Sequence, residues 1–138
     1  MRRFRLILSW RTDMGAQGTF WFMVLMHLVA DYTLQGWLAN GKQVSWWRDL
    51  AKGSKWEKYK HDYIVALACH SLYWSIMVCS PFYADPLFSL MVVAHAAFHG
   101  IVDDMKANSG MLNLVQDQAF HLIQIVMIYV WGVFYAGV

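Results

Sequence analysis

Residues 112–136 read LNLVQDQAFHLIQIVMIYVWGVFYA, and this stretch decides the class of fold. After Asp117 the chain contains no Asp, Glu, Lys or Arg through to Val138. A helix needs about 20 mainly apolar residues to cross the hydrocarbon core of a bilayer. The stretch therefore predicts a membrane-spanning helix, and it places Asp117 and His121 on one face near its start because they are four residues apart.

Three other segments share this scarcity of charge. Asp31 is the only charged residue between Asp13 and Lys42, and residues 63–84 and 86–102 contain none. Each segment is long enough to cross a bilayer, the third at the lower limit. We therefore predict an all-α fold in which one domain, residues 1–138, is an integral membrane bundle of four transmembrane helices, over 14–38, 62–83, 86–106 and 112–136.

The composition agrees with a membrane protein. The chain has 138 residues, of which 59% are apolar and 14% charged, whereas soluble domains have about 25% charged residues. A net charge of +2 is too small to indicate a nucleic-acid partner. Cys69 and Cys79 lie ten apart, form no CxxC motif and are expected to be inert packing residues.

Two segments suit the membrane surface. The first eleven residues are basic, but their apolar run is too short for a secretory signal, so we expect a retained interfacial segment. Residues 39–61 carry six Lys or Arg side chains mixed with three Trp and one Tyr, a composition typical of the headgroup layer. This basic loop and Lys106 together hold seven Lys or Arg, against four in the N-terminal segment. The positive-inside rule therefore places the loop in the cytoplasm and both termini outside.

The apolar segments contain unexpected His and Asp residues. An Asp near the bilayer centre costs about 2.5–3.5 kcal/mol on insertion scales, so such a residue usually has a partner and a function. Random placement would give about 0.7 His/Asp pairs four residues apart. The sequence has three: His27/Asp31, His99/Asp103 and Asp117/His121.

Seven of these residues are expected to lie at one depth. They lie about 5–18 Å from the helix ends that face the basic loop, measured along the helix axes. This holds although two of the predicted helices run towards the loop and two run away from it. Imidazole and carboxylate without thiolate favour a divalent transition metal, most of all zinc, with manganese or iron as alternatives. We predict one or two such ions, with ligands drawn from His27, Asp31, His70, His99, Asp103, Asp117 and His121.

Simpler interpretations remain open at this point. Hydrogen bonding between helices would explain any single His/Asp pair. His95, one turn before His99, is as readily a packing residue as a ligand, and His61 is expected at the interface.

The motifs resemble a known family. They are His27-Leu-Val-Ala-Asp31-Tyr-Thr-Leu-Gln35, Lys42, His70, His99-Gly-Ile-Val-Asp103-Asp-Met-Lys106 and Asp117-Gln118-Ala-Phe-His121. In this order, over about residues 20–125, they are similar to the small bacterial and phage membrane proteins of domain-of-unknown-function family 3307. The resemblance implies a bacterial inner membrane or a phage-associated one, and a distant similarity to predicted metal-dependent membrane hydrolases. The loop over 43–60 is longer and more basic than the resemblance leads us to expect.

Four polar residues of these motifs are expected around the metal ligands. Gln35 lies one turn beyond Asp31 and Gln118 adjoins Asp117, so both can orient ligands or contact a substrate. Lys42 and Lys106 lie at the membrane surface on the same side. They can bind a phosphate oxygen, although lysines there are as often interfacial anchors.

The leading functional hypothesis is a metal-dependent hydrolase acting on a lipid-linked phosphoester or pyrophosphate. Metal-bound water supplies a nucleophile without Ser or Cys, and the chain has no GxSxG motif and no glycine-rich phosphate loop. The expected partners are membrane lipids, in particular anionic headgroups. His70 is a ligand or a general acid, and Asp31 or Asp104 is the general base.

Two other hypotheses are weighed against this one. The metal could staple the helices of a non-catalytic structural or interaction protein, for example one encoded by a phage. An ion or proton path is the weakest hypothesis, because the helices predicted over 62–83 and 112–136 have no ionisable residue in their far halves.

Overall fold

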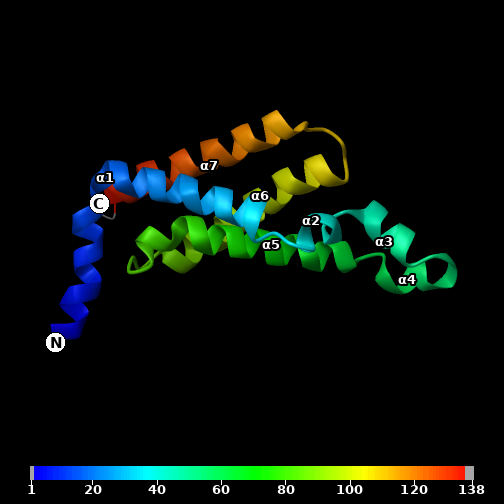
Figure 1. Ribbon diagram of the computed structural model, residues 1–138, viewed down its shortest axis with the longest axis horizontal. Helices are drawn as coiled ribbons and strands as arrows, with labels where there is room; N and C mark the ends of the chain where they lie inside the picture. The colour runs from blue at the N-terminus through cyan, green and yellow to red at the C-terminus, as the bar shows by residue number, and fades with distance from the viewer. Residues whose placement is uncertain (1, 136–138) are drawn as a thin grey trace.

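A computed structural model describes the backbone of residues 2–135 and the side chains of residues 15–53 and 55–135. Within these residues every regular element is helical and no strand occurs, which confirms the all-α prediction. The long helices run side by side along the molecule (Figure 1). They are α1 (Arg2–Leu28), α5 (Asp62–Cys79), α6 (Phe88–Ala107) and α7 (Leu114–Tyr135).

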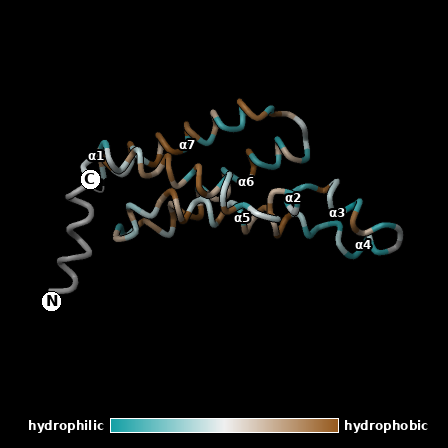
Figure 2. Tube along the Cα trace, in the orientation of Figure 1, coloured by the Kyte–Doolittle hydropathy of each residue, from teal (hydrophilic) through white to brown (hydrophobic). Residues whose placement is uncertain are grey.

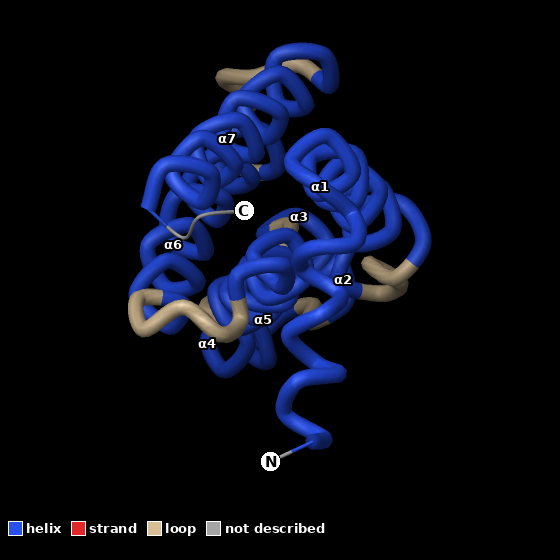
Figure 3. The backbone as a smooth tube through the Cα atoms, turned by 90° about the vertical axis from the view of Figure 1, so that its left-hand side faces the viewer, coloured by secondary structure: helices blue, strands red, loops and turns tan. Residues whose placement is uncertain are grey.

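The four helices form a ring when the bundle is seen from its end (Figure 3). Helix α5 packs against α1 and α6, and α7 packs against the same two helices. Every long helix thus has two helical neighbours and one outward face. The arrangement leaves an interior to which all four helices contribute.

Helix α1 departs from the prediction at both ends. Gly15, with φ +60°, interrupts it, and the part before Gly15 projects away from the bundle (Figure 1). The side chains of the predicted interfacial segment lie outside the described residues. At the other end, α1 passes into a π-helical turn, η1 (Val29–Thr33), closed by the Leu34 N–H on the Val29 carbonyl at 2.9 Å. The helix predicted over 14–38 therefore ends at Thr33, because the widened turn is followed by Gly36 at φ +52°.

The helices predicted over 86–106 and 112–136 agree with α6 and α7 within two residues, whereas α5 ends at Cys79, four residues before the end of the segment predicted over 62–83. The predicted segment 62–83 contains α5 and the 3-10 turn η3 (Ser80–Phe82). Helix α7 begins after a capping box, in which the Asn113 side chain accepts from the Gln116 N–H and the Gln116 side chain accepts from the Asn113 N–H, both at 3.0 Å. Pro86, expected in the first turn of α6, instead precedes that helix, which starts at Phe88.

The basic loop is largely helical, which the sequence did not indicate. Trp47 stacks on Tyr59 with ring centroids 6.3 Å apart, and its indole N–H donates to the Gly41 carbonyl at 2.6 Å. The Arg48 guanidinium lies 5.6 Å from the centre of the Trp56 ring. These contacts fold the segment into four short elements: α2 (Leu38–Gly41), α3 (Val44–Leu50), η2 (Gly53–Lys55) and α4 (Trp56–Tyr59).

Apolar side chains cover the outside of the long helices. Large examples are exposed on each of them: Trp21 at 60%, Val65 at 64%, Leu90 at 65% and Phe134 at 78%. Figure 2 shows hydrophobic residues along the long helices and hydrophilic ones gathered around α3 and α4. An apolar core, which includes Trp74, fills part of the interior, and buried His, Asp and Gln side chains occupy the rest.

Two stretches, Trp56–Phe82 and Leu114–Tyr135, are long and apolar enough to cross a membrane. They coincide with the spans predicted over 62–83 and 112–136. Membrane crossing by the other two predicted segments stays a prediction.

Gly132 on α7 gives a test of this packing. A Cβ at this position would overlap the ring of Phe82, which is fully buried. We expect Gly132→Val to lower the free energy of unfolding by about 1–3 kcal/mol, because overpacking forces neighbouring groups to move. The measurement is thermal unfolding in detergent micelles, followed by circular dichroism. Combined with Phe82→Leu, which shortens the opposing side chain, the loss should be smaller than the sum of the single losses; strictly additive losses would contradict the contact.

Candidate metal centre

Buried polar side chains from all four sides of the bundle meet in its interior. Element η1 contributes Asp31, α5 contributes His70, α6 contributes His99 and Asp103, and α7 contributes Asp117 and His121. The three histidines are fully buried, and the Asp side chains are at most 9% exposed. We call these six residues the His/Asp cluster. Their meeting confirms the prediction that residues on helices running in opposite directions reach one level.

His70 lies at the centre of one group of ligand atoms. Its Nε2 atom is 3.3 Å from Asp31 Oδ1, 3.2 Å from His99 Nε2 and 3.3 Å from Asp103 Oδ2. Metal–ligand bonds of about 2.0–2.1 Å in a tetrahedral zinc site place ligand atoms about 3.3–3.4 Å apart. Asp31, His70 and His99 together can therefore hold a metal ion.

A second group lies beside the first and shares His99. His99, Asp103 and His121 present ligand atoms within 4.8 Å of one another. His121 Nε2 is 3.4 Å from Asp103 Oδ1 and 3.3 Å from Asp117 Oδ1. The cluster thus continues from η1 and α5 across α6 to α7.

Several buried atoms of the cluster have no hydrogen-bond partner among the described residues. Three of them face its interior: Asp31 Oδ1, Asp117 Oδ1 and His121 Nε2. Leaving a buried polar atom unpaired costs about 1–3 kcal/mol, and more when it is charged. Carboxylate oxygens and imidazole nitrogens are ordinary ligands of zinc, manganese and iron, so a metal ion would satisfy these atoms.

Ring packing orients the histidines. The His99 ring packs against Trp74, at 4.3 Å between centroids and 22° between planes, and against His121, at 4.2 Å and 26°. The Nδ1 atoms of His70, His99 and His121 have no hydrogen-bond partner among the described residues. Ring packing, rather than a hydrogen bond to Nδ1, therefore orients His99 and His121.

His27, a predicted ligand, borders the cluster with both ring nitrogens engaged. Its Nδ1 accepts the Trp74 indole N–H at 2.9 Å, which leaves Nε2 to donate to Gln118 Oε1 at 3.1 Å. Gln118 in turn donates to Asp117 Oδ2 at 3.0 Å. Gln118 therefore has the orienting place predicted for it, while a ligand role for His27 stays a prediction.

Two lysines neutralise part of the carboxylate charge. Lys42 Nζ donates to Asp103 Oδ2 at 2.7 Å, and Lys106 Nζ donates to Asp117 Oδ2 at 2.6 Å. In the amide orientation that satisfies its neighbours, Gln35 accepts from Lys42 Nζ at 2.6 Å and from His70 Nε2 at 3.3 Å, and it donates to the Asp31 carbonyl at 3.2 Å. The lysines thus contact the cluster directly instead of serving only as surface anchors.

Asn108, which the sequence analysis did not single out, positions Lys42. Its side chain donates to the Lys42 carbonyl at 3.0 Å and accepts from the Val44 N–H at 2.8 Å. This fastens the segment between α2 and α3 to the end of α6.

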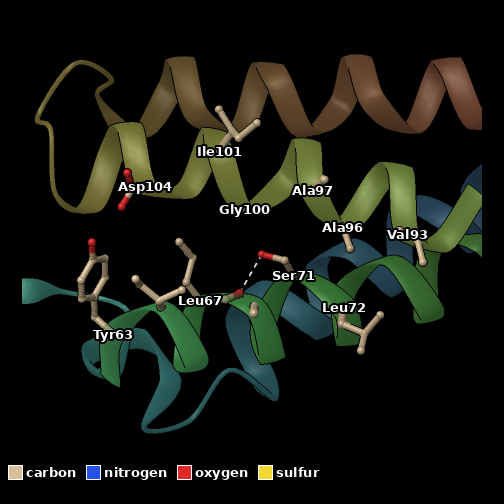
Figure 4. A pocket seen from close by; sticks show the side chains of 12 residues that line it. Tyr63, Leu67, Ser71, Leu72, Val93, Ala96, Ala97, Gly100, Ile101 and Asp104 are labelled. Atoms are coloured by element: carbon tan, nitrogen blue, oxygen red, sulfur yellow. Dashed lines mark hydrogen bonds between the residues drawn. The ribbon is translucent and has the colours of Figure 1, made fainter. Parts of the chain in front are cut away.

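Asp104, a predicted general base, lies away from the cluster. It sits at one end of a groove between α5 and α6, near Tyr63 (Figure 4). Its Oδ1 accepts from Asn108 Nδ2 at 2.7 Å. Of the two candidate bases, the structure brings only Asp31 into the cluster, and the role of Asp104 stays a prediction.

A cavity of about 140 Å³ adjoins the cluster. Its walls combine three cluster carboxylates with all four polar residues predicted to surround the ligands. The lining residues are Asp31, Tyr32, Gln35, Lys42, Asp103, Lys106, Leu114, Asp117 and Gln118. A small anion entering this cavity would meet two ammonium groups and the carboxylates that face the candidate metal positions.

Comparison with known proteins agrees with the family resemblance. The model of the family described as protein of unknown function (DUF3307) matches residues 19–136. The chain belongs to this family. No curated protein and no solved structure matches it significantly. The DUF3307 match includes every residue of the His/Asp cluster, and it extends beyond the residues 20–125 that the motifs covered.

His95, the remaining histidine of α6 in this DUF3307 chain, serves packing. Gln124 on α7 donates to the His95 carbonyl at 2.7 Å and lies 3.2 Å from its Nδ1. His95 is therefore a control for substitutions of His99, one turn away.

Trp74 tests how the ligands are held. We expect Trp74→Phe, which keeps a ring against His99 but removes the donor to His27 Nδ1, to lower the free energy of unfolding by about 1–3 kcal/mol. The measurement is thermal unfolding in detergent, with Trp21→Phe as control because Trp21 is 60% exposed. Equal effects of the two substitutions would count against this hydrogen bond.

Proposed function

We propose that this protein is an integral membrane hydrolase that uses a buried divalent metal centre to cleave a phosphoester or pyrophosphate of a membrane lipid. The observation that carries the proposal is the set of unpaired ligand atoms of the His/Asp cluster beside a cavity lined by Lys42 and Lys106. A bound metal ion would account for the burial of the carboxylates, because their oxygens are spaced as ligands of one site. The two ammonium groups favour an anionic substrate.

Zinc is the metal that the ligand chemistry favours, with manganese and iron as alternatives. When bound, the metal polarises phosphoryl oxygens and lowers the pKa of water to about 7. Asp31 borders the cavity and is the candidate base that lies in the cluster, so it is proposed to take the proton from the attacking water. His70 is fully buried and does not line the cavity, which favours a ligand role over that of a general acid.

The side chains that bind the phosphate are proposed to be those of the cavity wall. Lys106 is 32% exposed in its side chain and Lys42 11%, so Lys106 is the more accessible donor. Gln35 and Gln118 add amide groups to the same wall. Charge-assisted hydrogen bonds from ammonium groups to phosphate oxygens contribute about 1.5–3 kcal/mol each.

Membrane placement follows from the outer surface. Exposed apolar side chains on all four long helices suit lipid contact, so we propose that all four predicted spans cross or enter the bilayer. The Trp- and Lys-rich elements α2 to α4 then lie at the headgroups, beside the cavity that Lys42 helps to line. A cytoplasmic position of residues 39–61 in a bacterial inner membrane rests on the Lys and Arg distribution.

A non-catalytic metal staple is the second candidate. It is favoured by the complete burial of His70, His99 and His121, and by the contribution of every side of the bundle to the cluster. A metal bound there would stabilise the helical packing whether or not a substrate reached it.

The first test is metal content. We expect purified wild-type protein to contain a transition metal by elemental analysis, and His99→Ala to contain less, because His99 lies in both groups of candidate ligands. His95→Ala should keep the metal, since His95 bonds to Gln124 outside the cluster. Wild-type protein that stays metal-free after expression and dialysis with zinc, manganese or iron would overturn both candidates.

The second test separates a hydrolase from a staple. Detergent-solubilised protein is incubated with lipid phosphates and lipid pyrophosphates, and released phosphate is measured. We expect Lys106→Met to lower kcat/KM at least tenfold with metal content retained, through loss of a charge-assisted hydrogen bond. Lys60→Met is the matched control, because Lys60 pairs with Glu57 on the exposed surface. Phosphate release no greater than that of His99→Ala would favour the staple.

A further inference from the structure

The His/Asp cluster offers more ligand atoms than one ion can use. A tetrahedral zinc ion takes four ligands, whereas six side chains converge here. The two groups of candidate ligands share His99, but one imidazole nitrogen binds only one ion. His99 Nε2 lies 3.2 Å from His70 Nε2, against 3.7 Å from Asp103 Oδ2 and 4.0 Å from Asp31 Oδ1. This short distance assigns His99 to the His70 side.

We propose that the cluster is a two-ion centre in which the Asp103 carboxylate bridges the ions. The proposal rests on the metal-dependent function proposed above. The first ion would be held by four atoms: Asp31 Oδ1, His70 Nε2, His99 Nε2 and Asp103 Oδ2. The second would be held by three: Asp103 Oδ1, Asp117 Oδ1 and His121 Nε2.

The two oxygens of Asp103 face different histidines. Oδ2 is 3.3 Å from His70 Nε2, and Oδ1 is 3.4 Å from His121 Nε2. Both distances equal the separation of ligand atoms around one tetrahedral ion, about 3.3–3.4 Å. One carboxylate therefore supplies a ligand to each side.

The packing of His99 against His121 is compatible with two closely spaced ions. Their ring centroids are 4.2 Å apart, and their planes differ by 26°. Ions bound by two adjacent imidazoles would lie near each other, and two-metal sites that act on phosphate have ions about 3.5–4 Å apart.

The buried ligand atoms on α7 suit a second ion. His121 is fully buried and Asp117 is 1% exposed, yet His121 Nε2 and Asp117 Oδ1 have no hydrogen-bond partner among the described residues and only approach each other at 3.3 Å. An ion bound to both would satisfy them, whereas an ion bound only by the first set of ligands would leave them without a hydrogen bond.

The net charge of the site and the adjoining cavity indicate which exogenous ligand the second ion would bind. Asp31, Asp103 and Asp117 with Lys42 and Lys106 carry a net charge of −1 when all are ionised. Two divalent ions bring this to +3, which a phosphate group in the adjoining cavity would offset. Asp103 and Asp117 both line that cavity. The three-ligand set thus leaves a coordination position for a phosphoryl oxygen or water, as in catalytic zinc sites.

The test counts ions and asks whether they are coupled. Metal-free protein in detergent is loaded with zinc, and bound zinc is measured per chain. We expect two per chain for wild type and His95→Ala, and one for His121→Ala, whose helical content is checked by circular dichroism. One zinc in wild type, unchanged in His121→Ala, would overturn the two-ion centre while leaving a metal-dependent function intact. No zinc, manganese or iron in wild type would overturn both.

A second measurement asks whether the two ions are joined by a bridge. Wild-type protein loaded with manganese should give the electron paramagnetic resonance spectrum of an exchange-coupled pair, because a carboxylate joins the ions. Asp103→Asn should abolish the coupling. Two uncoupled manganese ions in wild type would overturn the bridge, and loss of both ions from folded His121→Ala would overturn the division into two ligand sets.

Discussion

Three carboxylates buried inside an apolar bundle are the constraint on which the rest of the structure depends. Burying an unpaired carboxylate is prohibitively costly, so the positions of Asp31, Asp103 and Asp117 require compensating groups. Lys42 and Lys106 supply two ammonium groups, and three histidines supply the remaining polar neighbours. The position of the short helices α2 and α3 matters for the same reason, because the segment between them places Lys42 beside Asp103.

The molecule reverses the usual arrangement of soluble proteins around this cluster. Polar side chains lie inside and large apolar ones face outward on all four long helices. Such a surface would drive aggregation in water and suits contact with lipid. Burial strengthens electrostatic interactions within the cluster, since little water reaches it to screen them.

Local pattern predicted much of this structure, and long-range contacts account for what it left out. Helices α5, α6 and α7 and the convergence of Asp103 with His121 followed from apolar segments and four-residue spacing. The pattern could not show that both nitrogens of His27 are engaged, because one partner, Trp74, is 47 residues away. Asn108 escaped notice for the same reason, since its bond to Val44 spans 64 residues. The DUF3307 match extended the family resemblance from about residue 125 to residue 136 without adding a reaction.

The π-helical turn η1 carries a consequence for how the chain tolerates change in length. A π turn is an α-helical turn with one residue more than usual, and Asp31 lies within it. Removing one residue from Val29–Thr33 would return this turn to the usual number of residues. A deletion before Asp31 would then move its carboxylate to a different position on the turn, because successive residues of an α-helix point in directions about 100° apart. The direction of the Asp31 carboxylate therefore depends on the number of residues in this turn. We expect the segment to tolerate substitutions better than deletions.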